Sequence, residues 1–206
     1  GLVLPGVEVK LDQPNEQGEG EILVKGPNVM VGYFQKPELT AEVLSGEGWL
    51  RTGDVGMWVN HRFLKITDRK KDIFKTSAGK YITPARLEQH FAQSAFINRC
   101  LILGFQRPYV TALVVPNFDM LEAWCTQQGV HWTSPPFMVH NIRVRTRMEE
   151  EIERLNEEVN AVERIRNFVL CPQDWSVEDG EVTATLKPVR HRLAERYKKE
   201  IEAMYK

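Results

Sequence analysis

The sequence has no long hydrophobic run and no excess of charge of either sign. None of its apolar stretches approaches the roughly 18 residues needed to cross a bilayer. The Leu2-Val3-Leu4 stretch is shorter than we expect of a signal-peptide core. A formal net charge of −1 gives no global electrostatic reason to expect nucleic acid as a partner. We therefore expect a cytoplasmic protein whose contact with a membrane, if any, is peripheral.

Cysteine is also scarce, at three residues in a chain of 206. Cys100, Cys125 and Cys171 are odd in number, widely spaced and set among apolar residues. This pattern favours buried free thiols in a reducing compartment over disulfides. Their spacing does not match that of metal ligands, and we expect no metal site among them.

The composition that remains is that of an ordinary globular protein, with 42% hydrophobic and 27% charged residues. The length allows one large or two small domains. Turn signals crowd the first 67 residues and separate short strands. The expected elements are strands at 7–11, 21–25 and 63–67, a hairpin turn at Asn60-His61, and a helix over 37–45. For this part we predict a small β-barrel or a folded-over sheet.

The rest of the chain alternates strands with amphipathic helices. The expected strands cover 99–105, 109–115 and 165–171, and the expected helices cover 84–93, the stretch after Asn117, 142–162 and 189–204. This pattern is typical of a compact α+β domain with helices packed against a short sheet. We therefore predict the α+β class, with a β-barrel-like subdomain followed by a compact α+β domain.

A charged stretch, Asp68–Pro84, joins the two halves. It contains five cationic side chains and two carboxylates around a short apolar pair. We interpret it as a domain boundary near a charged ligand, which divides the chain into residues 1–70 and 71–206. A solvated loop between elements is the simpler alternative. Nucleic-acid binding is disfavoured, because the cationic run is brief, is flanked by aspartates and has no stacking aromatics around it.

Asp54 follows Gly53 at the end of an expected strand. A carboxylate in this position can accept two hydrogen bonds from a vicinal diol such as ribose, or it can close an Asx turn with backbone N–H groups. Arg69 lies downstream across the expected hairpin, which can place both side chains on one rim. There Arg69 can donate to the same ribose or to a phosphate, or form only a surface ion pair.

Two further positions are candidates for ligand contact. The segment 76–80 resembles half of a phosphate loop but lacks its first glycine and its Lys-Ser/Thr ending, so we reject a P-loop. Gly79 still allows a ligand to approach the backbone closely. Lys187 lies on a threonine-rimmed loop before the last helix and can reach an anionic centre on its flexible stem. The alternative for Lys187 is an exposed lysine near a helix N-terminus.

The amino-acid sequences of these motifs and their order along the chain closely resemble the adenylate-forming (AMP-binding) superfamily, and above all its long-chain fatty acyl-CoA synthetase branch. The motifs are Gly20–Pro27, Val31–Phe34, Thr40–Glu42, Gly48–Asp54, Ile66–Asp72, Gly79–Pro84 with Glu88, and Leu186-Lys187. The longer form of Lys75–Lys80 and the ending Thr183–Lys187 favour that branch. The resemblance extends over the whole chain.

The resemblance implies an enzyme that uses ATP and Mg²⁺ to convert a fatty acid to an acyl-adenylate, and then transfers the acyl group to CoA while AMP leaves. It implies that Asp54 binds the ribose hydroxyls of ATP or AMP with help from Arg69. Lys71 matches the hinge about which the C-terminal domain swings between the two half-reactions.

For the remaining two sites, the resemblance implies that Gly79 and Lys80 face the pantetheine of CoA. It also implies that Lys187 enters the site for adenylation, where it neutralises charge between the carboxylate and the α-phosphate. Two positions depart from the family pattern: Asp68 stands before the arginine in place of the usual glycine, and Thr185-Leu186-Lys187 replaces Ser-Gly-Lys. We expect the leucine to stiffen the lysine's loop.

The family's phosphate loop, Mg²⁺ ligands and acyl pocket lie upstream of the region that this chain resembles. Residues 1–70 resemble the last β subdomain of the large N-terminal domain, and residues 71–206 resemble the mobile C-terminal domain. The expected function is therefore that of a C-terminal fragment of a long-chain fatty acid–CoA ligase, inactive alone. The alternatives are a ligase that uses an acyl carrier protein, and a non-catalytic nucleotide-binding or interaction module.

Overall fold

A computed structural model describes residues 1–69, 73–77 and 79–206. The chain divides into two compact units, Gly1–Ile73 and Phe74–Lys206, which are described separately. Within the described part of the chain, no helix is both long and apolar enough to cross a membrane.

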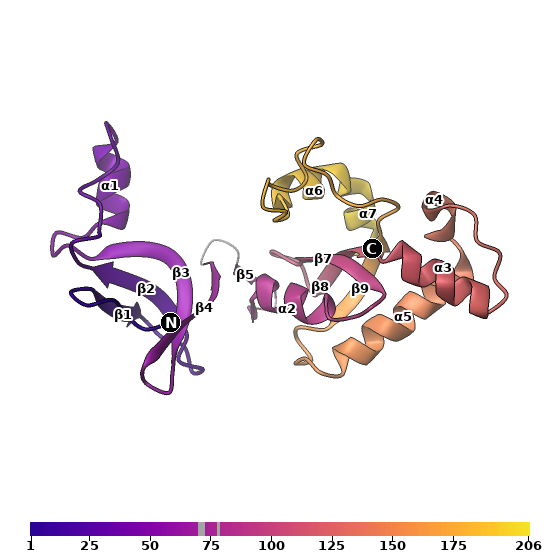
Figure 1. The fold of residues 1–206 in the computed structure, drawn as a ribbon, viewed down its shortest axis with the longest axis horizontal. Coiled ribbons are helices and arrows are strands. Elements are labelled where there is room, and N and C mark those ends of the chain that lie inside the picture. Colours follow the sequence, from indigo (N-terminus) through magenta and orange to yellow (C-terminus); the bar gives the residue numbers. More distant parts are fainter. Residues whose placement is uncertain (70–72, 78) are drawn as a thin grey trace. The chain divides into compact units, whose positions relative to one another are not determined.

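The first unit is a four-stranded antiparallel sheet with one short helix (Figure 1). Its elements are β1 (Glu8–Asp12), β2 (Gly20–Lys25), α1 (Pro37–Val43), β3 (Leu50–Val59) and β4 (Phe63–Arg69). The strands pair in chain order, β1-β2-β3-β4, because each is joined to the next without a crossover. The buried apolar core of this sheet is small and includes Ile22, Leu23 and Val55.

The hairpin predicted at Asn60-His61 is confirmed. β3 ends at Val59 and β4 begins at Phe63, and these two residues are Cα partners. Asn60 and His61 have φ angles of 52° and 54°, the left-handed values that a tight hairpin turn requires. This turn sets the register of β3 against β4, and the register places the candidate ribose-binding residues.

The predicted barrel is wrong, because the described strands form an open sheet. β1 and β4 are the two edges, and no strand ladder joins them. The outer edge of β4 is paired locally instead: the Leu64 N–H donates to the Gly1 carbonyl at 2.8 Å. Closing a barrel takes more strands than four, since the interior must be wide enough to hold side chains.

The second unit contains two sheets and six helices in the part of the chain that the structure describes. They are β5 (Phe74–Lys75), β6 (Tyr81–Ile82), α2 (Pro84–Phe91), β7 (Ile97–Leu103), β8 (Val110–Pro116), α3 (Phe118–Gln127), α4 (Pro135–Met138), α5 (Ile142–Asn156), β9 (Ile165–Leu170), α6 (Arg190–Arg196) and α7 (Lys198–Ala203). β7 and β8 are antiparallel, whereas β8 and β9 are parallel. The segment that carries α3, α4 and α5 is therefore the crossover between parallel strands.

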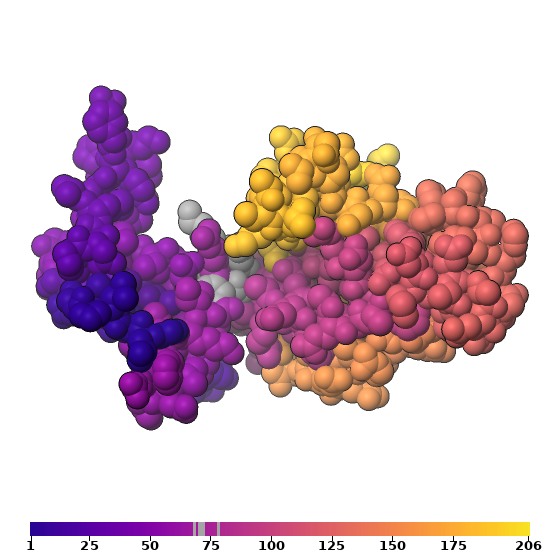
Figure 2. Space-filling model, viewed as in Figure 1, coloured from indigo at the N-terminus to yellow at the C-terminus, as the bar shows by residue number. Residues whose placement is uncertain are grey.

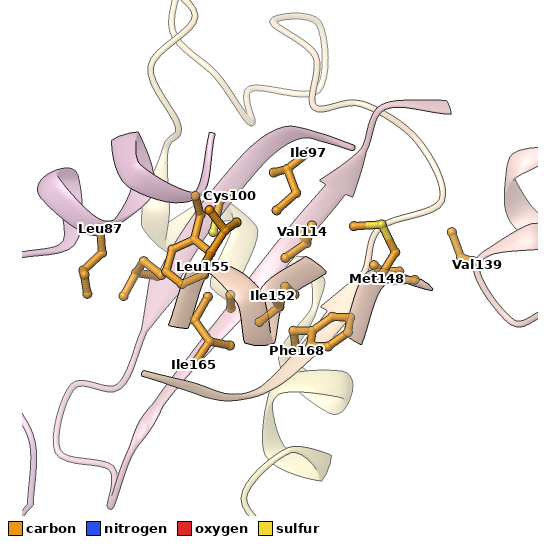
Figure 3. Packing of buried hydrophobic residues seen from close by; sticks show 14 of the residues in the cluster. Leu87, Ile97, Cys100, Val114, Val139, Met148, Ile152, Leu155, Ile165 and Phe168 are labelled. Carbon is orange, nitrogen blue, oxygen red and sulfur yellow. The ribbon is translucent and has the colours of Figure 1, made fainter. Parts of the chain in front are cut away.

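The sheet β7-β8-β9 is buried on both faces. Successive side chains along a strand point to opposite faces, so neighbouring residues enter two different apolar clusters. Cys100 and Val114 point into one apolar cluster, which also includes residues of α2, α3 and α5 (Figure 3). Leu101 and Leu113, the neighbours in each strand, belong to a second cluster that includes Leu193 of α6. Figure 1 shows α5 and α6 on opposite sides of these strands, and in Figure 2 the last helices, in yellow, cover one side of the unit.

Two helix predictions are corrected by contacts that residues at the helix ends make outside the helix. α5 ends at Asn156, not at residue 162, because the Asn156 side chain donates to the Ile165 carbonyl at 3.0 Å and accepts the Ile165 N–H at 2.9 Å. These bonds turn the chain into β9. The expected last helix is two helices, α6 and α7, which meet at Tyr197 (φ −98°, ψ 22°). The Tyr197 ring is buried in the second cluster, and the apolar periodicity alone does not reveal this change of direction.

Candidate functional site

Asp54 and Arg69 lie directly opposite each other in neighbouring strands. They are Cα partners in the β3–β4 ladder, and Arg69 Nε is 3.3 Å from Asp54 Oδ1. The hairpin therefore brings both side chains to one rim, as the sequence predicted. The Asp54 side chain is 29% exposed and that of Arg69 is 72% exposed. The pair is a surface ion pair, and both side chains remain accessible to a ligand.

The backbone at Asp54 is held by Thr52 and not by its own carboxylate. Thr52 Oγ1 donates to the Ile22 carbonyl at 2.8 Å and accepts the Asp54 N–H at 3.1 Å. Gly53, between them, has a φ of 73°, which a residue with a side chain adopts only under strain. The hydroxyl turn at Thr52 replaces the Asx turn considered as an alternative. The Asp54 oxygens can therefore accept hydrogen bonds from a diol while Arg69 supplies donors beside them.

Gly79 and Lys80 lie in the exposed turn between β5 and β6. Thr76 closes this turn. Its N–H donates to the Lys80 carbonyl at 2.9 Å, its carbonyl accepts the Gly79 N–H at 2.9 Å, and its hydroxyl accepts the Lys80 N–H at 3.2 Å. Gly79 has a φ of 79°, and a Cβ there would lie 3.7 Å from Lys75 Cε. The backbone conformation, and not lack of space, therefore requires the glycine.

The same turn is attached to the loop between β7 and β8. The Ser77 N–H donates to the Arg107 carbonyl at 2.9 Å, and the Gln106 N–H donates to the Lys75 carbonyl at 3.0 Å. Lys71, the expected hinge residue, lies outside the residues that the structure describes, and its role stays a prediction.

Lys187 lies in an exposed turn whose ends, Val182 and Pro188, pair as an antiparallel bridge. Thr183 holds the lysine backbone on both sides: its N–H donates to the Lys187 carbonyl at 2.9 Å, and its Oγ1 accepts the Lys187 N–H at 3.2 Å. Leu186 has a φ of 60°, a left-handed value that glycine adopts most easily. The residue in the place of the family's usual glycine thus keeps a glycine-like conformation.

Sequence reasoning missed Arg99, which contacts this turn from β7. Its Nη1 donates to the Leu186 carbonyl at 3.2 Å, and its Nε donates to Asp174 Oδ1 at 2.6 Å. The sequence signal was a charged residue at the start of the apolar strand expected over 99–105. Its partners lie 75 and 87 residues away, beyond the reach of any local pattern.

Sequence reasoning also missed the contact that anchors the chain immediately after Lys187. Arg190, the first residue of α6, donates from Nη2 to Glu88 Oε1 at 2.6 Å. Glu88 entered the sequence analysis only as part of a motif, without a role. Its position on α2 means that this ion pair ties the start of α6 to another helix.

Metal-ligand clusters and reactive thiols do not add to the site. Among the described residues, no three His, Cys, Asp or Glu side chains form a group that could hold a metal ion. All three cysteines are free and buried, as predicted. Burial raises the pKa of Cys171 to about 11. A thiol with this pKa is protonated at neutral pH, so Cys171 is a structural residue and not a nucleophile.

The chain is similar to known proteins over its whole length. The family of AMP-binding enzyme C-terminal domains matches residues 71–206. Human long-chain-fatty-acid–CoA ligase 6 is 34% identical over 214 residues, covering 100% of this chain and 31% of that protein. The putative fatty-acid–CoA ligase fadD11 of Mycobacterium tuberculosis is 35% identical over 206 residues, covering 100% of this chain and 35% of that protein. The chain thus spans about a third of the length of these relatives.

A solved structure shares the fold. It is the A domain of a carboxylic acid reductase from Segniliparus rugosus, in complex with AMP and a co-purified carboxylic acid. It matches with a TM-score of 0.80 at 26% identity, over 98% of this chain and 32% of that chain. The match covers both the sheet that carries Asp54 and the unit that carries Lys187.

Proposed function

We propose that this chain, which belongs to the family of AMP-binding enzyme C-terminal domains, is the carboxyl-terminal part of a long-chain fatty acid–CoA ligase. The observation that carries this proposal is the 34% identity to a relative of that name along the entire chain. The accessible Asp54–Arg69 pair and the rigidly held Lys187 backbone support it, since each suits a contact to a nucleotide substrate.

In the first half-reaction, a carboxylate oxygen of the fatty acid attacks the α-phosphorus of ATP. The bond from this phosphorus to the oxygen bridging to the β-phosphate breaks, and pyrophosphate leaves. Both reactants are anionic, so a cation where they meet lowers the barrier. Lys187 supplies this charge from a fixed backbone. Asp54 accepts hydrogen bonds from the ribose hydroxyls, and Arg69 adds donors beside them.

In the second half-reaction, the sulfur of CoA attacks the acyl carbonyl carbon. The bond from this carbon to the phosphate oxygen breaks, AMP leaves, and the thiol proton passes to solvent. Gly79 and Lys80 line the path of the pantetheine arm, because the exposed turn has no side chain at Gly79 and lets the arm lie against the backbone. Lys71 is the pivot for the rearrangement between the two half-reactions, which also shields the acyl-adenylate from water.

ATP enters this reaction as its Mg²⁺ complex, in which the ion neutralises phosphate charge. The described residues offer no acidic cluster for the ion, so we assign its protein ligands to a part of the ligase that this chain does not cover. We also infer a reducing, cytoplasmic compartment, which the three buried free thiols favour.

Exchange of labelled pyrophosphate into ATP tests the proposal. The 206-residue chain alone should not support exchange with long-chain fatty acids, and robust exchange would contradict its assignment as one part of the ligase. In the full-length ligase, Lys187→Ala should abolish adenylation and spare thioester formation from preformed acyl-adenylate. Lys198→Ala, an exposed lysine on α7, is the matched control and should leave both steps unchanged. Equal loss of both steps in Lys187→Ala would contradict the role of Lys187.

A further inference from the structure

The peptide group between Leu186 and Lys187 is bonded at both of its polar atoms. Its carbonyl oxygen, on Leu186, accepts a hydrogen bond from Arg99 Nη1 at 3.2 Å. Its N–H, on Lys187, donates to Thr183 Oγ1 at 3.2 Å. The orientation of this peptide sets the direction in which the Lys187 side chain leaves the backbone. Arg99 is therefore the long-range contact that fixes this orientation, whereas Thr183 acts from within the turn.

This peptide needs to be held because Leu186 is in a strained conformation. Its φ of 60° brings Cβ close to the following carbonyl, a cost that glycine does not have. Strained residues persist only where the surrounding structure over-determines them. Without the bond from Arg99, the turn can rearrange so that the φ of Leu186 becomes negative, and this rearrangement redirects Lys187.

Arg99 is itself rigidly placed. It lies in β7 opposite Val115, and its side chain is only 21% exposed. Its Nε donates to Asp174 Oδ1 at 2.6 Å, while Asn98 Nδ2 donates to Asp174 Oδ2 at 3.0 Å. The Trp175 N–H donates to Asp174 Oδ1 at 2.8 Å, which fixes the carboxylate in turn. A guanidinium held in this way presents its remaining donors in a set direction.

Arg99 and Lys187 differ in whether their charge is balanced by a neighbouring side chain. The charge of Arg99 is balanced by Asp174, with which it forms an ion pair. Lys187 is exposed, and its ammonium has no ion-pair or hydrogen-bond partner among the residues that the structure describes. Arg99 is thus suited to hold the turn, and Lys187 is suited to meet an anionic substrate.

We propose that Arg99 is a positioning residue for adenylation, which holds the Leu186–Lys187 peptide so that Lys187 is presented toward the reacting phosphate. This inference rests on the proposed function of Lys187. Arg99 touches neither substrate, and it acts only through the turn. Because the second half-reaction does not use Lys187, loss of Arg99 should slow the first half-reaction alone.

The test measures both half-reactions in the full-length ligase that contains this chain. Arg99→Leu should lower kcat for pyrophosphate exchange by about tenfold to a hundredfold, the usual effect of a misplaced catalytic group. Thioester formation from preformed acyl-adenylate should be unchanged. Arg99→Lys, which keeps the charge and one donor, should recover part of the lost rate. Arg86→Leu is the matched control, because Arg86 pairs with Glu163 away from the turn, and it should behave as wild type.

A second measurement tests the Arg99 contact directly, in case Arg99→Leu lowers activity only because the variant misfolds. In the 206-residue chain, Asp174→Asn removes the charge that fixes Arg99 without placing an apolar group in the site. Amide hydrogen exchange at Leu186 and Lys187 should accelerate in this variant and in Arg99→Leu, but not in Arg86→Leu. Unchanged exchange in both variants would overturn the proposed contact.

The outcomes separate the two proposals. If Lys187→Ala abolishes adenylation and Arg99→Leu leaves it intact, the positioning role is wrong and the proposed function stands. If Arg99→Leu slows both half-reactions equally, the substitution disturbs the enzyme as a whole and not the Lys187 turn alone, and the positioning role is again wrong. If Lys187→Ala leaves adenylation intact, the proposed role of Lys187 fails, and the inference about Arg99 fails with it.

Discussion

Arg190 and Glu88 form an ion pair that spans 102 residues of sequence, with Nη2 and Oε1 2.6 Å apart. The same Glu88 oxygen accepts the Ile102 N–H at 2.8 Å, and Arg190 Nη1 donates to the Ile102 carbonyl at 3.0 Å. One carboxylate therefore joins α2, β7 and α6. Since α6 begins just after Lys187, the contact that closes this unit also fixes the downstream end of the lysine's turn.

Glu88→Ala should lower the free energy of unfolding by about 2–4 kcal/mol, because it leaves the Arg190 guanidinium and the Ile102 N–H without a shared acceptor. Urea unfolding followed by circular dichroism measures this change. Glu149→Ala is the control: Glu149 and Arg145 are 3.8 Å apart and exposed, so its effect should stay under about 0.5 kcal/mol. Equal losses in the two variants would contradict the prediction.

Glu151 should make the protein less stable in acid. Burial raises the pKa of Glu151, but hydrogen bonds from Arg154, Ser94 and Arg147 outweigh this effect, so the net pKa is lower than the usual 4.5. A group with a lowered pKa in the folded state contributes stability above its unfolded pKa and loses it as the pH falls through the folded value. The free energy of unfolding should therefore decline as the pH falls below about 4.5.

Glu151→Gln is the variant that isolates this effect, since glutamine keeps the size of the side chain and does not titrate. Urea titrations from pH 7 to pH 3 should show a shallower decline for Glu151→Gln than for wild type. Parallel curves would mean that another group causes the acid sensitivity.

Gly79→Ala should destabilise the second unit by about 1 kcal/mol, since an alanine at a left-handed φ carries a steric cost that glycine avoids. Gly46→Ala is the matched control, because Gly46 has no positive φ and no atom within 4 Å of the position of an added Cβ. Thermal unfolding of both variants measures the difference.

In the full-length ligase, the proposed role of this turn adds a kinetic expectation for Gly79→Ala. The KM for CoA should rise, while the rate of pyrophosphate exchange should not change. A slower exchange with an unchanged KM for CoA would assign the turn to the wrong half-reaction.

Asp54→Ala should raise the KM for ATP in the full-length ligase by about tenfold to a hundredfold, the loss expected for two charge-assisted hydrogen bonds to ribose. Steady-state pyrophosphate exchange over a range of ATP concentrations measures this KM. Asp12→Ala is the control, because Asp12 forms a similar ion pair with Arg51 in the same sheet but is not a candidate ligand residue. An equal effect of both substitutions would indicate a general disturbance of the sheet.

Features that depend on neighbouring residues were predictable from the sequence. The helix expected after Asn117 is present, and the Asn117 side chain caps it by accepting the Met120 N–H at 3.3 Å. The left-handed turn at Asn60-His61 was also predicted correctly, as was the helix from Pro84, which buries Leu87 and Phe91. Each of these rests on contacts within one turn or on a simple periodicity, so composition and spacing suffice.

The points at which a helix stops were not predictable in this way. The apolar pattern of α5 continues beyond Asn156, where the helix ends. The helix ends there because the Asn156 side chain binds the backbone of Ile165, the first residue of β9. The last helix breaks at Tyr197 for a similar reason, as its ring enters a cluster built from distant strands. A periodicity records which residues are apolar, but it does not record where the chain must turn to bury them.

Sequence patterns were sufficient to predict the α+β class, the hairpin turn at Asn60-His61 and the residues that the family resemblance singled out. Only the tertiary structure showed the contacts between distant elements. Arg99 reaches Leu186 because β7 and the last turn pack together, and Arg190 reaches Glu88 because the start of α6 lies beside α2. Such pairs join residues far apart in the chain, and their formation depends on the packing of the whole unit, which no local pattern contains.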